Sequence, residues 1–167
     1  MNRSIVFTTS KPESAVYKTV QLALENESFT CVDLTTKNFL DYCPLNSHIS
    51  DDFLALAEQM VQHENIILAC PVYWYSVPAL MKRFIDRWSD ILTIRKDIGR
   101  KLHGKKLFII ACYGTYPDGY EGFELPLQKT ASYMDMRYGG SLIYYTGDNP
   151  EGLSKNKINL EKFRSYF

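Results

Sequence analysis

The sequence predicts an α/β protein, a doubly wound three-layer αβα sandwich around a five-stranded parallel sheet. Two observations carry this prediction. Five short apolar runs alternate with stretches of helical periodicity, which is the pattern of repeated βαβ units. The runs are continuously apolar, as expected of strands buried on both faces. Right-handed crossovers then place helices on both sides of the sheet.

The expected strands cover residues 4–8, 28–34, 65–70, 106–113 and 141–146. Apolar side chains at helical spacing mark the helices between and after them, at Val16, Val20, Ala23 and Leu24; at Phe53, Leu56, Met60 and Val61; at Met81, Phe84, Ile85, Trp88 and Ile91; and at Ile158 and Phe163. Ser50 is the expected cap of the second helix. A further helix is expected from about Pro126 to Arg137, with Gly139-Gly140 ending it.

Composition favours one domain, residues 1–167, and excludes some partners. Lys+Arg and Asp+Glu each total 19, so the formal net charge is zero and there is no basic surplus of the kind typical of nucleic-acid binders. The chain has no signal-peptide pattern and no run near the roughly 20 apolar residues of a membrane span. We therefore expect a cytoplasmic protein without nucleic-acid or membrane partners.

The cysteines and histidines predict no metal site. Cys31, Cys43, Cys70 and Cys112 form no CxxC or Cys/His pattern, and His48, His63 and His103 share no metal-ligand spacing. Three of the cysteines lie in apolar strand-like runs, where a buried, reduced thiol is expected.

In a doubly wound sheet, ligands bind outside the carboxyl ends of the strands, near the topological switch point. The loops after the first, third and fourth strands are therefore the candidate ligand loops. The first, TTSKPESAV, brings hydroxyls and Lys11 to the start of a helix, where free N–H groups can hold a phosphate. Alternatively, Ser10 and Glu13 form an S-x-x-E capping box that satisfies the same N–H groups internally.

The second loop, PVYWYSVP, contains three consecutive aromatic residues between two prolines. Pro71 ends a strand and Pro78 suits the first turn of a helix. Individual rings could pack on neighbouring helices or contact a partner subunit. A loop has only one inner side, however, so three rings in a row predict a binding surface for a flat ligand.

The third loop, YGTYPDGYEGF, adds glycines that permit close backbone approach and tyrosines that extend the apolar wall. The three loops together describe a phosphate end and a flat aromatic middle, which is the shape of a flavin mononucleotide (FMN) site. The basic segment 94–106 is interpreted as a solvated turn or, alternatively, as an attractor for pyridine-nucleotide phosphates. Asp86 and Arg87 are expected on the polar side of their helix, where surface ion pairs are one interpretation of them.

The segment 71–87 resembles the P-x-Y-x-x-x-x-P-x-x-x-K-x-x-x-D-R motif of flavodoxin-like NAD(P)H-dependent oxidoreductases, which include FMN reductases and NAD(P)H:quinone reductases. Leu102-His103-Gly104-Lys105-Lys106 is similar to that family's L-x-G-K-K. The resemblance implies a flavodoxin-like sheet of order 2-1-3-4-5, bound FMN, NAD(P)H as co-substrate, and a homodimer or homotetramer.

The resemblance also implies which residues bind the cofactor. The FMN phosphate would be held by the first loop, through Thr9, Lys11, Ser14 and Ala15. The isoalloxazine ring would lie against the second loop, through Pro71, Val72, Tyr73, Trp74, Tyr75 and Ser76. The third loop would close the other side, through Tyr113, Gly114 and Tyr116.

The implied activity is hydride transfer from NAD(P)H to FMN and on to a small-molecule acceptor such as a quinone or free flavin, with no catalytic side chain. Two alternatives stay open. One is a flavodoxin-type electron carrier without pyridine-nucleotide turnover, although such carriers are typically acidic and this chain is neutral. The other is a flavin-free interaction module that uses its aromatic loop as a protein contact.

Overall fold

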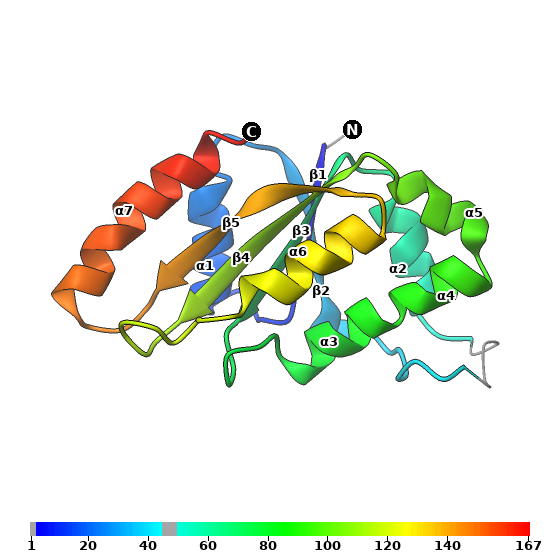
Figure 1. The fold of residues 1–167 in the computed structure, drawn as a ribbon, viewed down its shortest axis with the longest axis horizontal. Coiled ribbons are helices and arrows are strands. Elements are labelled where there is room, and N and C mark those ends of the chain that lie inside the picture. The colour runs from blue at the N-terminus through cyan, green and yellow to red at the C-terminus, as the bar shows by residue number, and fades with distance from the viewer. Residues whose placement is uncertain (1–2, 45–49) are drawn as a thin grey trace.

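The protein is described by a computed structural model that covers residues 3–44 and 50–167. His48, one of the histidines considered above, lies outside the described residues. Strands and helices alternate along the chain (Figure 1), in the order β1 (Ser4–Thr8), α1 (Ala15–Ala23), β2 (Phe29–Asp33), α2 (Phe53–Met60), β3 (Asn65–Pro71), α3 (Ala79–Asp86), α4 (Trp88–Thr93), α5 (Lys96–Gly99), β4 (Lys106–Tyr113), α6 (Glu124–Tyr133), β5 (Arg137–Tyr145) and α7 (Pro150–Arg164).

The five strands form one parallel sheet of order β2-β1-β3-β4-β5, which confirms the predicted topology. The chain leaves β1 toward β2 on one side and returns to β3 on the other, so the topological switch point lies between β1 and β3. In register, Thr8 pairs with Ala69, and Pro71 pairs with Cys112. The carboxyl ends of β1, β3 and β4 therefore meet at one edge of the sheet.

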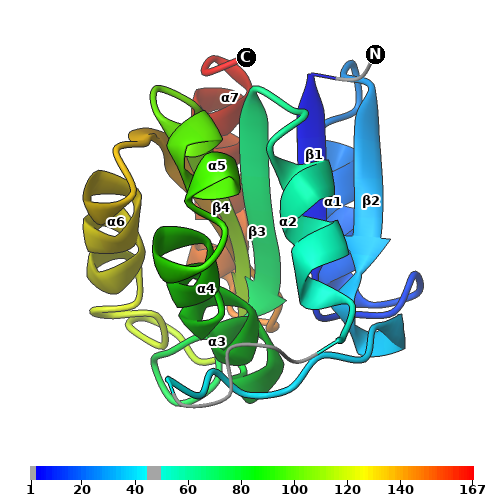
Figure 2. The same ribbon diagram turned by 90° about the vertical axis from the view of Figure 1, so that its right-hand side faces the viewer.

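Helices cover both faces of the sheet. Helices α2 to α6 lie on one face, and α1 and α7 lie on the other (Figure 2). Each face of the sheet carries its own hydrophobic core. Because side chains alternate along a strand, Ile5 and Phe7 of β1 lie in the core under α2 to α6, whereas Val6 lies in the core under α1 and α7. The apolar stripe predicted for α1 is buried as expected against β3 and β4.

The edge strands are less buried than the continuous apolar runs suggested. In β2 only Val32 is fully buried, and Cys31 is exposed, so the predicted burial of its thiol was wrong. β2 is an edge strand and therefore lacks a neighbouring strand on one side. Cys70 and Cys112, on the central strands, are buried as predicted.

The predicted end of the helix before β5 was also wrong. Helix α6 ends at Tyr133, Asp135 adopts a left-handed conformation with φ of 54°, and Arg137 already begins β5. The glycines lie inside the strand instead of capping the helix. Gly139 is needed there because a Cβ atom would stand 2.4 Å from the ring of Phe108.

Two polar predictions around α2 and α3 need correction. Helix α2 begins at Phe53, and the backbone N–H of Phe53 donates to Asp51 instead of being capped by Ser50. Arg87 lies between α3 and α4 and is buried, with 3% of its surface exposed, so it is not a surface residue. Asp86 does form an exposed pair with Lys82.

Within residues 3–44 and 50–167, none of the helices combines the length and the apolar character that crossing a bilayer requires.

Candidate functional site

The three candidate ligand loops follow β1, β3 and β4 and lie together at the carboxyl edge of the sheet, along the lower side of Figure 1. The first loop is tied to the neighbouring strand, because the backbone N–H of Thr9 donates to the carbonyl of Ala69 at 3.3 Å. The loops therefore surround the switch point, where this fold class binds ligands.

The start of α1 is available to an anion. Ser14 caps the helix by accepting a hydrogen bond from the N–H of Tyr17 at 3.1 Å, so the predicted capping box of Ser10 and Glu13 does not form. Ala15 is the first helical residue and is exposed, and no acidic side chain lies in the first turn. Its N–H group and the helix dipole are thus free to attract a phosphate.

Thr9 supplies a second sign that this loop binds a ligand. Its hydroxyl oxygen is shielded from solvent and has no hydrogen-bond partner among the described residues. A buried hydroxyl without a partner costs about 1–3 kcal/mol, so such groups are rare unless something else satisfies them. A phosphate oxygen held at the start of α1 would be a suitable acceptor.

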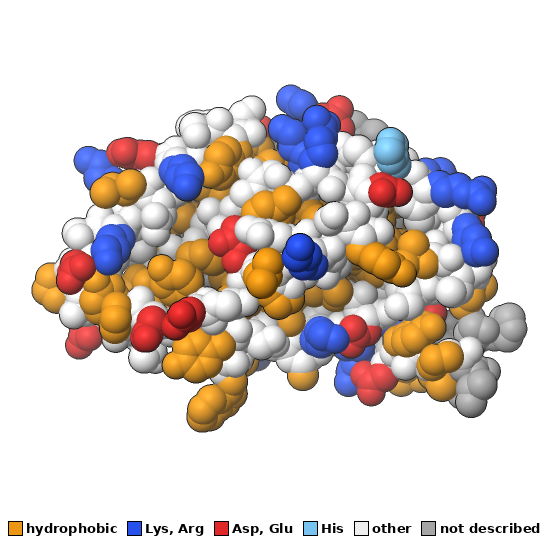
Figure 3. Space-filling model, viewed as in Figure 1, with side chains coloured by type: hydrophobic (Ala, Val, Ile, Leu, Met, Phe, Trp, Pro, Cys, Tyr) orange, Lys and Arg blue, Asp and Glu red, His pale blue; other side chains and the backbone are white. Residues whose placement is uncertain are grey.

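The aromatic loop after β3 forms a tight hairpin turn. Tyr73 and Ser76 exchange backbone hydrogen bonds of 2.9 and 3.0 Å. Trp74 and Tyr75 stand between them with φ of 51° and 60°, a left-handed conformation that suits Asn-Gly far better than two aromatic residues. Trp74 is 95% exposed, and hydrophobic side chains project from this lower edge of the molecule (Figure 3).

Strain in this turn can be measured directly. Replacing the pair by Asn-Gly (W74N/Y75G) is expected to raise the free energy of unfolding of the ligand-free protein by about 1–2 kcal/mol, because a left-handed conformation costs about that much per bulky residue. Urea unfolding measures the change. The control W74A/Y75A removes the rings but keeps the backbone strain, so it should leave stability nearly unchanged. Equal stabilisation by both variants would contradict a strained turn.

A cleft of about 270 Å³ lies between the second and third loops. Its walls come from residues after β3 and from the end of β4 and its loop, namely Val72, Trp74, Tyr75, Tyr113, Gly114, Thr115 and Gly119. A Cβ atom added to Gly114 would meet nothing within 4 Å, so the backbone there faces open space. Burial raises the pKa of the Tyr113 hydroxyl above its usual value.

Only part of the second loop offers free backbone donors. The N–H groups of Val72, Tyr73 and Ser76 are bound to the carbonyls of Cys112, Ser76 and Tyr73. Pro71 has no N–H group. Among the described residues no acceptor is found for the N–H groups of Trp74 and Tyr75, which leaves the tip of the turn as the donor-bearing part of the cleft.

A family model described as having a flavodoxin-like fold matches residues 2–165. The chain belongs to the flavodoxin-like fold family. An uncharacterized NAD(P)H oxidoreductase of Bacillus subtilis, YrkL, is 37% identical over 99 residues, which are 52% of this chain and 55% of that protein. The chain spans about half the length of the curated relatives it matches.

Solved structures share the fold of this flavodoxin-like chain. Trp repressor binding protein from Bacillus subtilis aligns with a TM-score of 0.75 at 18% identity, over 98% of both chains. An FMN-dependent NADH-azoreductase from Bacillus anthracis, solved in complex with FMN, aligns with a TM-score of 0.69 at 13% identity, also over 98% of both. At these identities the likeness shows the fold alone.

The flavodoxin-like fold brings together some predicted residues and separates others. Val72, Trp74, Tyr75, Tyr113 and Gly114 line one cleft. The first-loop residues stand beside the end of β3 and do not line that cleft, and neither do Pro71, Tyr73 and Ser76, which form and support the turn.

Tyr116 points to another part of the flavodoxin-like structure. Its ring packs against Tyr145, with 5.7 Å between the ring centres, and its hydroxyl accepts a hydrogen bond of 3.0 Å from Lys155 of α7.

Thr115 lines the cleft, although the sequence analysis did not include it among the site residues between Gly114 and Tyr116. The sequence could have indicated Thr115, because it follows a glycine at the end of a strand. Nothing in the sequence predicts that Lys155 contacts this loop.

Proposed function

We propose that the protein is an FMN-dependent NAD(P)H oxidoreductase that passes hydride from NAD(P)H to bound FMN and on to a quinone, free flavin or similar acceptor. The observation that carries this proposal is the presence, at the same carboxyl edge of the sheet, of an unpartnered buried hydroxyl on Thr9 and of an aromatic cleft between the loops after β3 and β4. Support comes from relatives named NAD(P)H oxidoreductases and from an FMN complex with the same fold.

The first loop fits the phosphate end of FMN. Ala15 offers its N–H group at the start of α1, Thr9 offers an unpartnered hydroxyl, and Lys11 is exposed in the same loop. Ser14 can donate its hydroxyl proton while its oxygen caps the helix. These groups hold a dianion with hydrogen bonds and only one formal positive charge.

The second and third loops fit the ring end. Tyr113 and the turn residues Trp74 and Tyr75 supply apolar walls that exclude water, and the free N–H groups at the turn can donate to the polar edge of a planar ring. Pro71, Val72, Tyr73 and Ser76 hold this turn in position. Bound FMN supplies the hydride-accepting chemistry, while the protein contributes orientation and donors.

Absorption spectroscopy of the purified protein, followed by NAD(P)H titration, tests the proposal. We expect bound or readily bound FMN and steady NAD(P)H oxidation with a quinone or free flavin as acceptor. Flavin binding without turnover would favour an electron carrier, and absence of FMN binding would overturn the proposal.

Trp74→Ala tests whether the aromatic turn belongs to the cofactor site. It is expected to weaken FMN binding about tenfold, because a stacking wall is lost. Ile158→Ala, which removes an exposed apolar side chain on α7, is the control and should leave FMN binding unchanged. If Trp74→Ala changes only oligomerisation, the turn is a protein contact instead.

We propose further that the protein works in the cytoplasm as a homodimer or homotetramer. An apolar groove of about 370 Å³ between α3, α4 and α6, lined in part by Trp88, Leu92, Tyr133 and Met134, offers surface for such assembly. Light scattering during size-exclusion chromatography measures the oligomer, and a monomer at micromolar concentration would contradict this assembly.

A further inference from the structure

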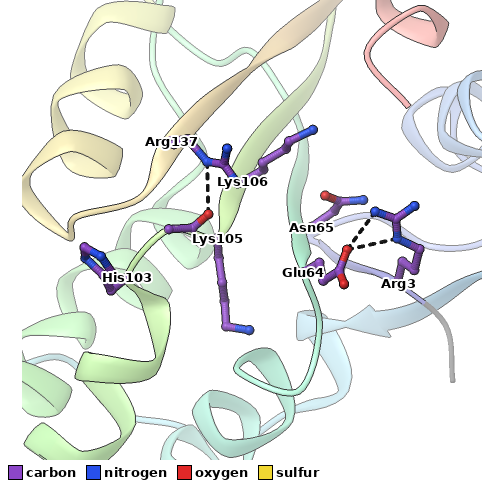
Figure 4. A pocket seen from close by; sticks show the side chains of 8 residues that line it. Arg3, Glu64, Asn65, His103, Lys105, Lys106 and Arg137 are labelled. Carbon is purple, nitrogen blue, oxygen red and sulfur yellow. Dashed lines mark hydrogen bonds and ion pairs between the residues drawn. The ribbon is translucent and has the colours of Figure 1, made fainter.

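A second cavity lies at the opposite edge of the sheet, where the strands begin (Figure 4). Its volume is about 440 Å³, and its lining includes Arg3, Lys105, Lys106 and Arg137 as cationic groups but only Glu64 as an anionic one. We call this cavity the basic pocket. It carries a formal surplus of three positive charges, from four cations and one carboxylate, in a protein whose net charge is zero.

Strand register forces two of these cations together. Lys106 and Arg137 are the first residues of β4 and β5 and are paired directly across the two strands. Residues in register on parallel strands point to the same face of the sheet, so the two side chains start side by side, as Figure 4 shows. Like charges placed opposite one another destabilise a sheet unless an anion neutralises them.

The carboxylate in the basic pocket forms its ion pair with a third cation and is only a weaker, longer-range partner of Lys106. Glu64 is bound to Arg3, with hydrogen bonds of 2.8 and 2.9 Å to the same oxygen. Lys106 forms no ion pair among the described residues, and its ammonium nitrogen lies 6.0 Å from the ring centre of Phe108. Two donors therefore remain available for an external anion.

The other contacts of the basic pocket hold its cations in place. Arg137 donates from Nε to the carbonyl of Gly104 at 3.1 Å, which fixes the guanidinium, and its two terminal nitrogens have no hydrogen-bond partner within the described part of the chain. Lys105 donates to the carbonyl of His63 at 2.8 Å. Both anchors are backbone carbonyls, so neither removes the positive charge.

We propose that the basic pocket binds a diphosphate group, held mainly by Lys106 and Arg137. The planar fork of an arginine matches two phosphate oxygens, and a neighbouring ammonium adds a second charge-assisted contact. Lys106 is seven residues from Tyr113, or about 23 Å along an extended strand. The site is therefore separate from the aromatic cleft and does not depend on the proposed oxidoreductase function.

Calorimetric titration of the purified protein with inorganic pyrophosphate at low ionic strength tests this site. Lys106→Gln and Arg137→Gln should each raise the Kd for pyrophosphate about tenfold, because each removes a charge-assisted contact. Lys157→Gln, an exposed residue of α7 outside the pocket, changes the net charge equally and should have less than a twofold effect. NAD(P)H turnover should be the same in all three variants.

Titration with ADP distinguishes the source of the diphosphate. Tighter binding of ADP than of pyrophosphate would assign the site to a nucleotide, and equal or weaker binding would assign it to a free diphosphate. The proposal is overturned if pyrophosphate does not bind, or if Lys157→Gln weakens binding as much as the two pocket variants.

Discussion

Replacing Arg87 with methionine is expected to lower the free energy of unfolding by about 3–5 kcal/mol, because it leaves two buried carboxylates without their counter-ion. Arg87 donates from Nε to Asp90 at 2.6 Å and from Nη1 to Asp51, and its guanidinium lies 4.7 Å from the ring centre of Phe53. The side chains of both ion pairs are at most 7% exposed. Urea unfolding at neutral pH measures the loss.

Arg83→Met provides a matched control in the same motif. Arg83 also pairs with an aspartate of the loop before α2, Asp41, but 40% of its side chain and 80% of its partner's are exposed. An exposed pair contributes at most about 1 kcal/mol, so this variant should be nearly as stable as the natural protein. If both variants lose the same free energy of unfolding, burial does not explain the contribution of Arg87 to stability.

Arg87 also determines how stability depends on pH. Burial raises the pKa of Asp51, but the hydrogen bond from Arg87 and two from backbone N–H groups outweigh it and hold that pKa below its usual value. A depressed carboxyl pKa stabilises the folded state above the unfolded value, about 3.9, and this contribution is lost as pH falls through the folded pKa. Stability should therefore fall below about pH 4, and fall less in Arg87→Met.

The sequence predicted the sheet because its signal is local. Each strand is a continuous apolar run, so the five strands and their parallel arrangement follow from patterns within a few residues, whereas their order in the sheet was implied by the family resemblance. Arg87 could not be placed this way. Its partner Asp51 lies 36 residues earlier, in a loop whose path no periodicity reports. The prediction that Gly139 and Gly140 end α6 was wrong for a similar reason, since Gly139 lies against Phe108 of β4 and Gly140 against Tyr166 beyond α7, both distant in sequence.

The candidate site was predicted by loop position more than by individual residues. Topology alone brought the three loops to one edge, and the cleft contains Trp74, Tyr75 and Tyr113 as the aromatic pattern suggested. The direction of a side chain in a loop depends on contacts that the sequence does not reveal. Tyr116, for example, turns toward Lys155 of α7. Thr9 stands out from the other hydroxyls of its loop only because the structure shows its oxygen buried and without a hydrogen-bond partner among the described residues.

Thr9→Val is expected to change cofactor affinity and stability in opposite directions. Valine has nearly the shape of threonine but lacks the hydroxyl, which is buried and unpartnered in the ligand-free protein. Its removal should raise the free energy of unfolding of that form by about 1 kcal/mol, since an unsatisfied polar group disappears. In the complex the same hydroxyl would donate to a phosphate, so FMN binding should weaken roughly tenfold to a hundredfold.

A rise in stability together with a loss of FMN affinity is expected only if the Thr9 hydroxyl binds the ligand. Urea unfolding of the FMN-free protein gives the stability, and quenching of flavin fluorescence gives the affinity. Thr9→Ser keeps the hydroxyl and should retain FMN binding, whereas a packing defect would lower both stability and affinity in Thr9→Val. If Thr9→Val destabilises the FMN-free protein and leaves FMN affinity unchanged, the hydroxyl serves the fold, and the phosphate contacts lie elsewhere at the start of α1.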